Sequence, residues 1–133
     1  MSYYFSKTME SDFDSVIAKI TEELKREGFG ILTEIDVAAT LRKKLDIDLT
    51  DIGFRKYKIL GACNPGLAYQ ALQAEDKIGT MLPCNVIVQE HEDGKVEVSA
   101  VDPVASMIAI ENTSLSATAT AVREKLKNVM EQL

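Results

Sequence analysis

The sequence predicts a single α+β domain over residues 1–133, built on one mostly antiparallel sheet with helices packed on one face. Three observations predict this class: strand-like and helix-like patterns alternate along the chain, a tight hairpin follows them, and a long amphipathic helix ends the sequence. A chain of 133 residues is long enough to build one ordinary hydrophobic core. If helices cover only one face, the other face must be wet, lined by a ligand or covered by a second subunit.

The elements are expected in the order β-α-β-α-β-α-β-β-α, with one short helical turn before the last helix. We expect strands at residues 3–9, 31–36, 57–63, 84–89 and 96–101. We expect helices after Ser11 and at residues 37–45, 65–72, 104–108 and 115–132.

Cap residues predict where the helices start. Ser11, with Asp14 three residues later, resembles an acidic version of the capping box. Asp36, Asn64 and Asp102 can each accept a backbone N–H of a first helical turn. Pro65 suits the first helical position, because its ring presets φ and its missing N–H would have no partner there.

Apolar periodicity predicts the buried faces. The inward stripe of the first helix is Phe13, Val16, Ile17, Ile20 and Leu24. The last helix has a seam at Leu115, Ala119, Val122, Leu126, Val129 and Leu133. Because the seam lasts under three heptads, it is expected to pack on the sheet rather than in a coiled coil. Elsewhere we expect Ile31, Thr33 and Ile35 on one strand face, and Val37, Leu41, Leu45, Leu67, Ala68, Ala71, Leu72, Ile78, Met81 and Leu82 inward.

Residues 46–54, 73–83 and 92–95 are expected to be loops or turns. Asp-Gly at the centre of residues 92–95 can supply the positive φ angles of a tight hairpin turn. Asp46, Asp48 and Asp51 are spaced a little like a calcium loop. The glycine and the last glutamate of that motif do not follow in register, which argues against calcium.

Composition and charge exclude several function classes. Hydrophobic residues make up 46% and charged residues 27% of the chain, and the net charge is −6, which argues against a nucleic-acid-binding surface. The basic clusters at residues 42–44 and 55–58 are interpreted as solvated charges. The sequence has no apolar run of membrane-spanning length and no secretory signal pattern, so we expect no membrane association and a cytoplasmic location. Two cysteines in that compartment are expected to be reduced.

Cys63 is the sharpest candidate for chemistry, because it comes one residue before the predicted cap Asn64. The partial positive charge at a helix start can lower a thiol pKa and favour the thiolate. The functional interpretation is a redox-active, nucleophilic or metal-binding thiol, and the alternative is a small apolar residue at the end of a buried strand. Cys84 opens the next strand, so antiparallel pairing would bring the two thiols close together and parallel pairing would separate them.

Other chemistry is poorly supported. Two thiolates and His91 would suit zinc, but the spacing is not a zinc signature and His91 near a hairpin tip is typical of a solvated side chain. With a single histidine, nothing indicates a hydrolytic triad. The strand-region carboxylates Glu34, Asp36, Glu90 and Asp102 form no obvious pair. Tyr69, Tyr57, Met81 and Met107 are candidates for lining a pocket, although such residues are also ordinary core material.

Several segments resemble a known family in order and spacing. They are ILGACNP at residues 59–65, LPC at 82–84, DGKV at 93–96 and the Asp102-Pro103 pair, and they resemble the domain of unknown function 302 family. The similarity runs from ILTEIDV at residues 31–37 through the last helix. It implies a compact α+β fold of the TATA-binding-protein-like type, usually a dimer, from bacteria or archaea. It implies no activity, and a fold label does not imply DNA binding.

We therefore expect a cytoplasmic, non-enzymatic homodimer that binds an unknown small molecule or partner protein near Cys63, Asn64, Pro65, Tyr69 and Cys84. The alternative is a thiol-dependent redox protein or enzyme, with Cys63 as nucleophile and Cys84 as resolving thiol. A third hypothesis is a metal-carrying or metal-sensing protein that binds a metal such as zinc through the same thiols.

Overall fold

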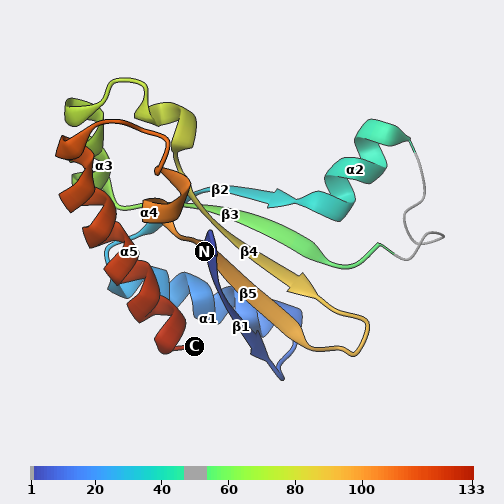
Figure 1. Ribbon diagram of the computed structural model, residues 1–133. Helices are drawn as coiled ribbons and strands as arrows, with labels where there is room; N and C mark the ends of the chain where they lie inside the picture. Colours follow the sequence, from blue (N-terminus) through green and yellow to red (C-terminus); the bar gives the residue numbers. More distant parts are fainter. Residues whose placement is uncertain (1, 47–53) are drawn as a thin grey trace.

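The structure, a computed structural model, describes residues 2–46 and 54–133 (Figure 1). Its strands are β1 (Tyr4–Met9), β2 (Gly30–Asp36), β3 (Tyr57–Cys63), β4 (Cys84–Glu90) and β5 (Val96–Val101). Its helices are α1 (Phe13–Arg26), α2 (Val37–Leu45), α3 (Pro65–Ala74), α4 (Pro103–Ser106) and α5 (Ser116–Glu131). Short 3₁₀ turns lie at Ile78–Met81 and Thr113–Leu115.

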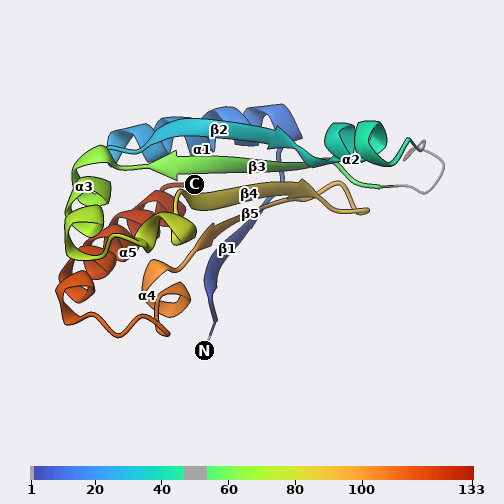
Figure 2. The same cartoon turned by 90° about the horizontal axis from the view of Figure 1, so that it is seen from above.

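The strands form one five-stranded sheet in the order β1-β5-β4-β3-β2, and every neighbouring pair is antiparallel. The α+β class, the single antiparallel sheet with helices on one side and the element order are therefore confirmed. The arrangement is also compatible with the TATA-binding-protein-like type. Figures 1 and 2 show α3, α4 and the start of α5 gathered at one end of the sheet, whereas α2 projects beyond the other end of β2 and β3.

The main hydrophobic core lies between the sheet and the pair α1 and α5. Alternate strand residues supply it, because successive side chains of a strand point to opposite faces. The strand residues of this core are Leu60, Ala62, Cys84, Val86, Val88, Val96, Val98 and Ala100. The helix residues are Phe13, Val16, Ile20 and Leu24 of α1 and Leu126, Val129 and Met130 of α5. The predicted inward faces of both helices are confirmed.

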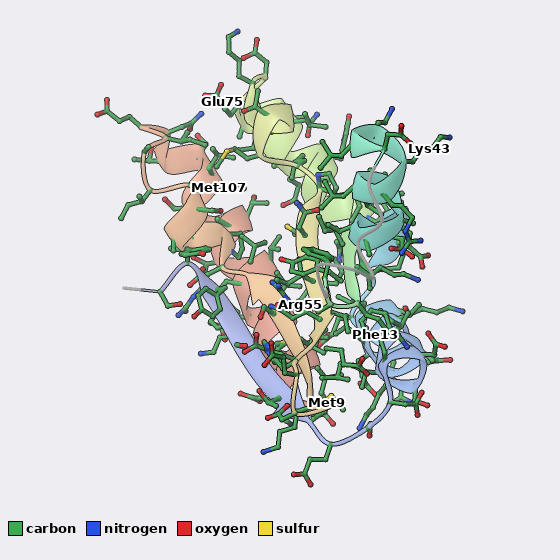
Figure 3. The ribbon with its side chains drawn as sticks, turned by 90° about the vertical axis from the view of Figure 1, so that its right-hand side faces the viewer. Met9, Phe13, Lys43, Arg55, Glu75 and Met107 are labelled. Atoms are coloured by element: carbon green, nitrogen blue, oxygen red, sulfur yellow. The ribbon has the colours of Figure 1, made fainter. Side chains whose placement is uncertain are left out.

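A second, smaller cluster lies at the end of the sheet where α3, α4 and α5 meet. Its buried members are Ala71, Ile78 and Leu115. Asn112 closes this end by donating its Nδ2 hydrogens to the Ala74 carbonyl at 2.7 Å and to Glu75 Oε1 at 3.3 Å. Figure 3 shows Glu75 and Met107 at this end of the molecule and Met9 and Phe13 at the opposite end.

Three of the predicted helix starts are confirmed and one is wrong by a residue. Asp36, Asn64 and Asp102 each accept a backbone N–H at the first turn of the helix that follows. The N-cap of α1 is Asp12 rather than Ser11, since Asp12 accepts from Ser15 N at 3.0 Å and from Ser15 Oγ at 2.7 Å. These hydrogen bonds from Ser15 lower the pKa of the Asp12 carboxyl. A carboxylate one residue closer to the helix therefore displaces the serine from the cap position.

The edge strand β2 differs from the expected alternation. Ile31 pairs with Ala62 and Thr33 pairs with Gly61, so Leu32 is an extra residue in a β-bulge. The bulge puts Ile31 against the core and leaves Thr33 and Ile35 on the other face. The expectation that all three residues share one face is wrong because the bulge breaks the period of two.

Some residues expected inside are exposed. Leu45, Leu72 and Met81 are exposed, whereas Ile78 is fully buried. No other helix or strand of the described residues covers the side chains of Leu45, Leu72 and Met81. Apolar spacing along a helix or loop was therefore not enough to predict which of these residues are buried. The hairpin turn was expected to have positive φ angles at Asp93 and Gly94. Of these two residues only Gly94 has a positive φ, at 83°. Asp48 and Asp51 of the rejected calcium pattern lie outside the described residues.

Candidate functional site

The junction of β3 and α3 forms as the sequence predicts. Cys63 ends the strand, Asn64 caps the helix and Pro65 occupies its first turn. Asn64 Oδ1 accepts from Leu67 N at 3.3 Å, and Asn64 Nδ2 donates to the Glu27 carbonyl at 3.3 Å. The Asn64 side chain therefore ties the start of α3 to the end of α1.

The two cysteines lie at the same end of the sheet. β3 and β4 are antiparallel, and Cys84 pairs with Ala62, the residue before Cys63. The approach that antiparallel pairing predicts is thus observed. Both thiols are free; Cys84 is buried and Cys63 is half-buried.

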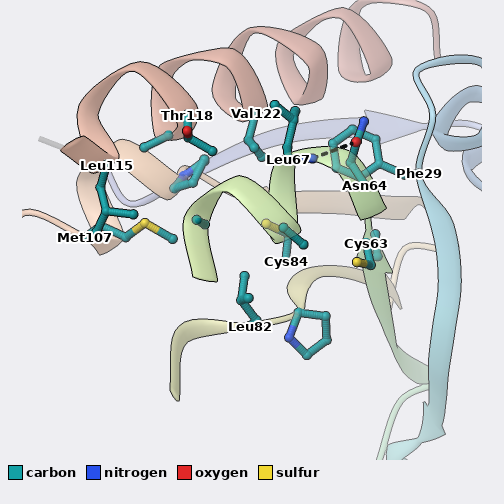
Figure 4. A pocket seen from close by; sticks show the side chains of 16 residues that line it. Phe29, Cys63, Asn64, Leu67, Leu82, Cys84, Met107, Leu115, Thr118 and Val122 are labelled. Atoms are coloured by element: carbon teal, nitrogen blue, oxygen red, sulfur yellow. Dashed lines mark hydrogen bonds between the residues drawn. The ribbon is translucent and has the colours of Figure 1, made fainter. Parts of the chain in front are cut away.

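Both thiols line a small cavity of about 40 Å³ between the sheet end, α3, α4 and α5 (Figure 4). Figure 4 shows Met107, Leu115 and Thr118 at the opposite end of the cavity from Cys63. The lining residues are Phe29, Ala62, Cys63, Asn64, Leu67, Ala68, Ala71, Leu82, Pro83, Cys84, Pro103, Met107, Leu115, Thr118, Ala119 and Val122. None of them carries a charge, so the cavity suits an uncharged occupant. Its volume holds only a few heavy atoms, since one water needs about 10–15 Å³ by the same measure.

Cys84 is kept neutral by its surroundings. Burial raises the pKa of the Cys84 thiol to about 11, and the nearby charge of Cys63 adds to the rise. At pH 7 about one Cys84 side chain in ten thousand is then a thiolate. This environment suits packing or a neutral contact and disfavours nucleophilic attack by Cys84.

Of the other sequence candidates, Met107 lines the cavity, whereas Tyr57, Met81, Tyr69, Pro65 and His91 do not. Tyr69 is exposed and Pro65 faces solvent; neither lines the cavity. His91 follows the far end of β4, about 20 Å along the strand from Cys84, and its Nε2 lies 3.3 Å from Glu97 Oε1. Within residues 2–46 and 54–133, no three Cys, His, Asp or Glu side chains are grouped as a metal ion needs. The zinc set Cys63, Cys84 and His91 is therefore not brought together.

Several lining residues were not identified as site residues from the sequence. Phe29, Leu82 and Thr118 come from three segments that are distant in sequence. The seam of the last helix did predict that Leu115, Ala119 and Val122 point inward, but not that a gap remains in front of them. No local pattern reports such a gap, because it depends on how separate elements pack.

The fold and the cavity define the chain as a small α+β protein with a partly open apolar cavity at one end of an antiparallel sheet. The family model described as "Domain of unknown function DUF302" matches residues 5–133. The chain belongs to this family.

A solved structure supports the fold. The crystal structure of an uncharacterized conserved protein DUF302 from Bacillus stearothermophilus aligns with a TM-score of 0.87 and 23% sequence identity. The alignment covers 99% of this chain and 98% of the other. At this identity the likeness extends to the fold alone. The comparison with curated proteins gives no match. None of the helices in residues 2–46 and 54–133 combines the length and the apolar character that crossing a membrane requires.

Proposed function

We propose that the chain is a single domain that forms a homodimer in the cytoplasm. Each copy acts as a binding module that takes a small uncharged ligand at the β3–α3 junction. The observation that carries the proposal is the cavity lined by Cys63, Cys84 and Asn64, which contains no charged side chain. Apolar cavities bind small apolar molecules, because such ligands lose water contacts there without leaving a charge unpaired.

The size of the cavity limits the ligand. At about 40 Å³ it is about a quarter of an engineered cavity of about 150 Å³ that takes benzene. A ligand of more than a few heavy atoms therefore requires movement of the smaller cluster, where Met107 and Leu82 pack beside the cavity.

The test uses xenon as the smallest apolar probe and benzene as a larger one. Proton–carbon NMR shifts of methyl groups lining the cavity are followed during titration of each probe, with Ala68→Leu as the matched filled-cavity variant. Ala68 lines the cavity and is half-buried, so a larger side chain there occupies cavity space, and the fold of the variant is checked by its methyl spectrum without a probe. Saturable shifts at Leu67, Leu115 and Val122 that vanish in the variant support the proposal. Unsaturable shifts, or equal shifts in Ala68→Leu, contradict it.

The second candidate function is thiol chemistry, because both cysteines line the same cavity. In this case Cys63 is the nucleophile or a soft-metal ligand, and Cys84 acts only after losing its proton to a base or a metal. The pH dependence of alkylation, mapped separately for Cys63 and Cys84, tests it together with metal analysis of the native protein. A low-pKa reaction confined to Cys63 would favour thiol chemistry, and protection removed by a chelator would favour a metal site.

A further inference from the structure

The sheet face opposite α1 and α5 carries an apolar row that crosses three strands. Ile35 of β2 pairs with Ile59 of β3, which pairs with Ile87 of β4. The row continues through Ser99 of β5 to Ser6 of β1, whose hydroxyls lie 3.1 Å apart. Neither hydrophobic cluster of the described residues includes the three isoleucines. A sheet face exposed to water normally carries polar side chains at such positions, so this row indicates a covered face.

On one side of the row, Arg55, Gln89 and Glu97 are linked to one another. Arg55 Nε donates to Gln89 Oε1 at 2.8 Å, and Gln89 Nε2 donates to Glu97 Oε1 at 3.2 Å. The Arg55 guanidinium also lies 5.2 Å from the centre of the Tyr57 ring. The positive charge of Arg55 and the negative charge of Glu97 thus add no net charge to this face, although the whole chain has a net charge of −6. Two acidic copies can meet here without the repulsion that their net charges would cause elsewhere.

The size of the face suits a second copy of the chain. Five strands spaced about 4.8 Å apart make the sheet about 24 Å wide. About six residues per strand, with a rise of about 3.3 Å each, make it about 20 Å long. Two such faces in contact bury about 1,000 Å², the lower limit for a specific protein interface. A two-fold interface brings the same patch of each copy together, so an axis along the row stacks isoleucine on isoleucine. The polar network then lies at the rim, as in most interfaces.

We propose that this face, centred on Ile35, Ile59 and Ile87, is where two copies of the chain pack sheet against sheet. The inference rests on the homodimer of the proposed function and adds where the two copies meet.

The test measures oligomer mass by sedimentation over a range of concentrations. The natural chain should sediment as two 14.7 kDa copies. Ile35→Lys and Ile87→Lys should each raise the dimer dissociation constant at least about tenfold, because each charge enters the interface twice. The matched control is Ile108→Lys, since Ile108 is 75% exposed after α4 and lies outside the sheet. It should leave the dissociation constant unchanged.

A crosslinking measurement does not depend on how well a lysine variant folds. Facing sheets lie about 10 Å apart, so a bis-maleimide of about 10 Å should join two copies of Ile35→Cys and not two copies of Ile108→Cys. A monomeric natural chain would contradict the homodimer as well as its location. A dimer that persists unchanged in both lysine variants, with no crosslink in Ile35→Cys, would leave the homodimer standing and overturn this interface.

Discussion

The Cys84 thiol should be nearly inert toward alkylation in the folded protein. Burial, with a smaller effect from the charge of Cys63, raises its pKa from the ordinary value of 9.0 to about 11. A rise of about two pH units lowers the thiolate fraction at neutral pH about a hundredfold, and the alkylation rate should fall by a similar factor. The surrounding cavity wall slows the reaction further by limiting access.

The same pKa difference makes the free energy of unfolding depend on pH. In the unfolded chain Cys84 loses its proton near pH 9, whereas in the folded chain it keeps it until about pH 11, so the folded state binds more protons in between. The stabilisation is fully present below pH 9 and is lost as the pH rises through about 11. Two pH units correspond to about 2–3 kcal/mol.

The assay combines iodoacetamide labelling between about pH 7 and pH 11, peptide mapping, and denaturant unfolding at the same pH values. Cys84→Val is the control, since a β-branched residue suits a strand and cannot titrate. The loss of stability above pH 9 should be smaller in this variant by about 2–3 kcal/mol. Labelling of native Cys84 with a midpoint at or below pH 9 would refute the reasoning.

Three further substitutions test the packing around the site, each by urea denaturation. Asn64→Ala removes the cap of α3 and its hydrogen bond to the end of α1, and should lower the free energy of unfolding by about 1–2 kcal/mol. Asn64→Asp keeps the cap and should lower it less. Equal losses in the two variants would contradict the capping role. Gly61→Ala places a Cβ against Thr33 Oγ1 and the Pro83 ring and should cost about 1–3 kcal/mol, and an unchanged midpoint would mean that Thr33 moves away freely. Leu126→Asp should abolish folding because Leu126 is fully buried. Leu126→Ala should lower the free energy of unfolding by about 2–5 kcal/mol. A Leu126→Asp chain that folds but is monomeric would make the apolar seam of α5 an interface instead.

The sequence predicted those features that depend on a few neighbouring residues. Asn64 followed by Pro65 identified the start of α3, because a side-chain acceptor and a preset φ act within one helical turn. Antiparallel pairing then determined that the ends of β3 and β4 meet, so the neighbourhood of Cys63 and Cys84 followed from one assumption about topology. The error at Ser11 was of the same local kind, since two adjacent residues could both cap.

The cavity and its lining could not be predicted because they depend on contacts between distant segments. Met81 and Met107 have the same side chain and each lies at the end of a short helical segment, yet Met107 lines the cavity and Met81 is exposed. Tyr69 has helical spacing to Leu72, but both lie on the outer side of α3. Which side of α3 is covered depends on α5, about fifty residues later in the sequence, and no local pattern contains that information.

The bulge in β2 connects the core to the proposed interface. An unbroken strand would place Ile31, Thr33 and Ile35 on one face, so the core and the isoleucine row could not both take an isoleucine from β2. The extra residue Leu32 shifts the alternation, and Ile31 then packs into the core while Ile35 pairs with Ile59 on the other face. A bulge on an edge strand also hinders pairing with the edge of another sheet. Leu32 therefore disfavours pairing of β2 with the edge of another sheet. By shifting the alternation, it also places Ile35 in the apolar row of the face that we propose as the dimer interface.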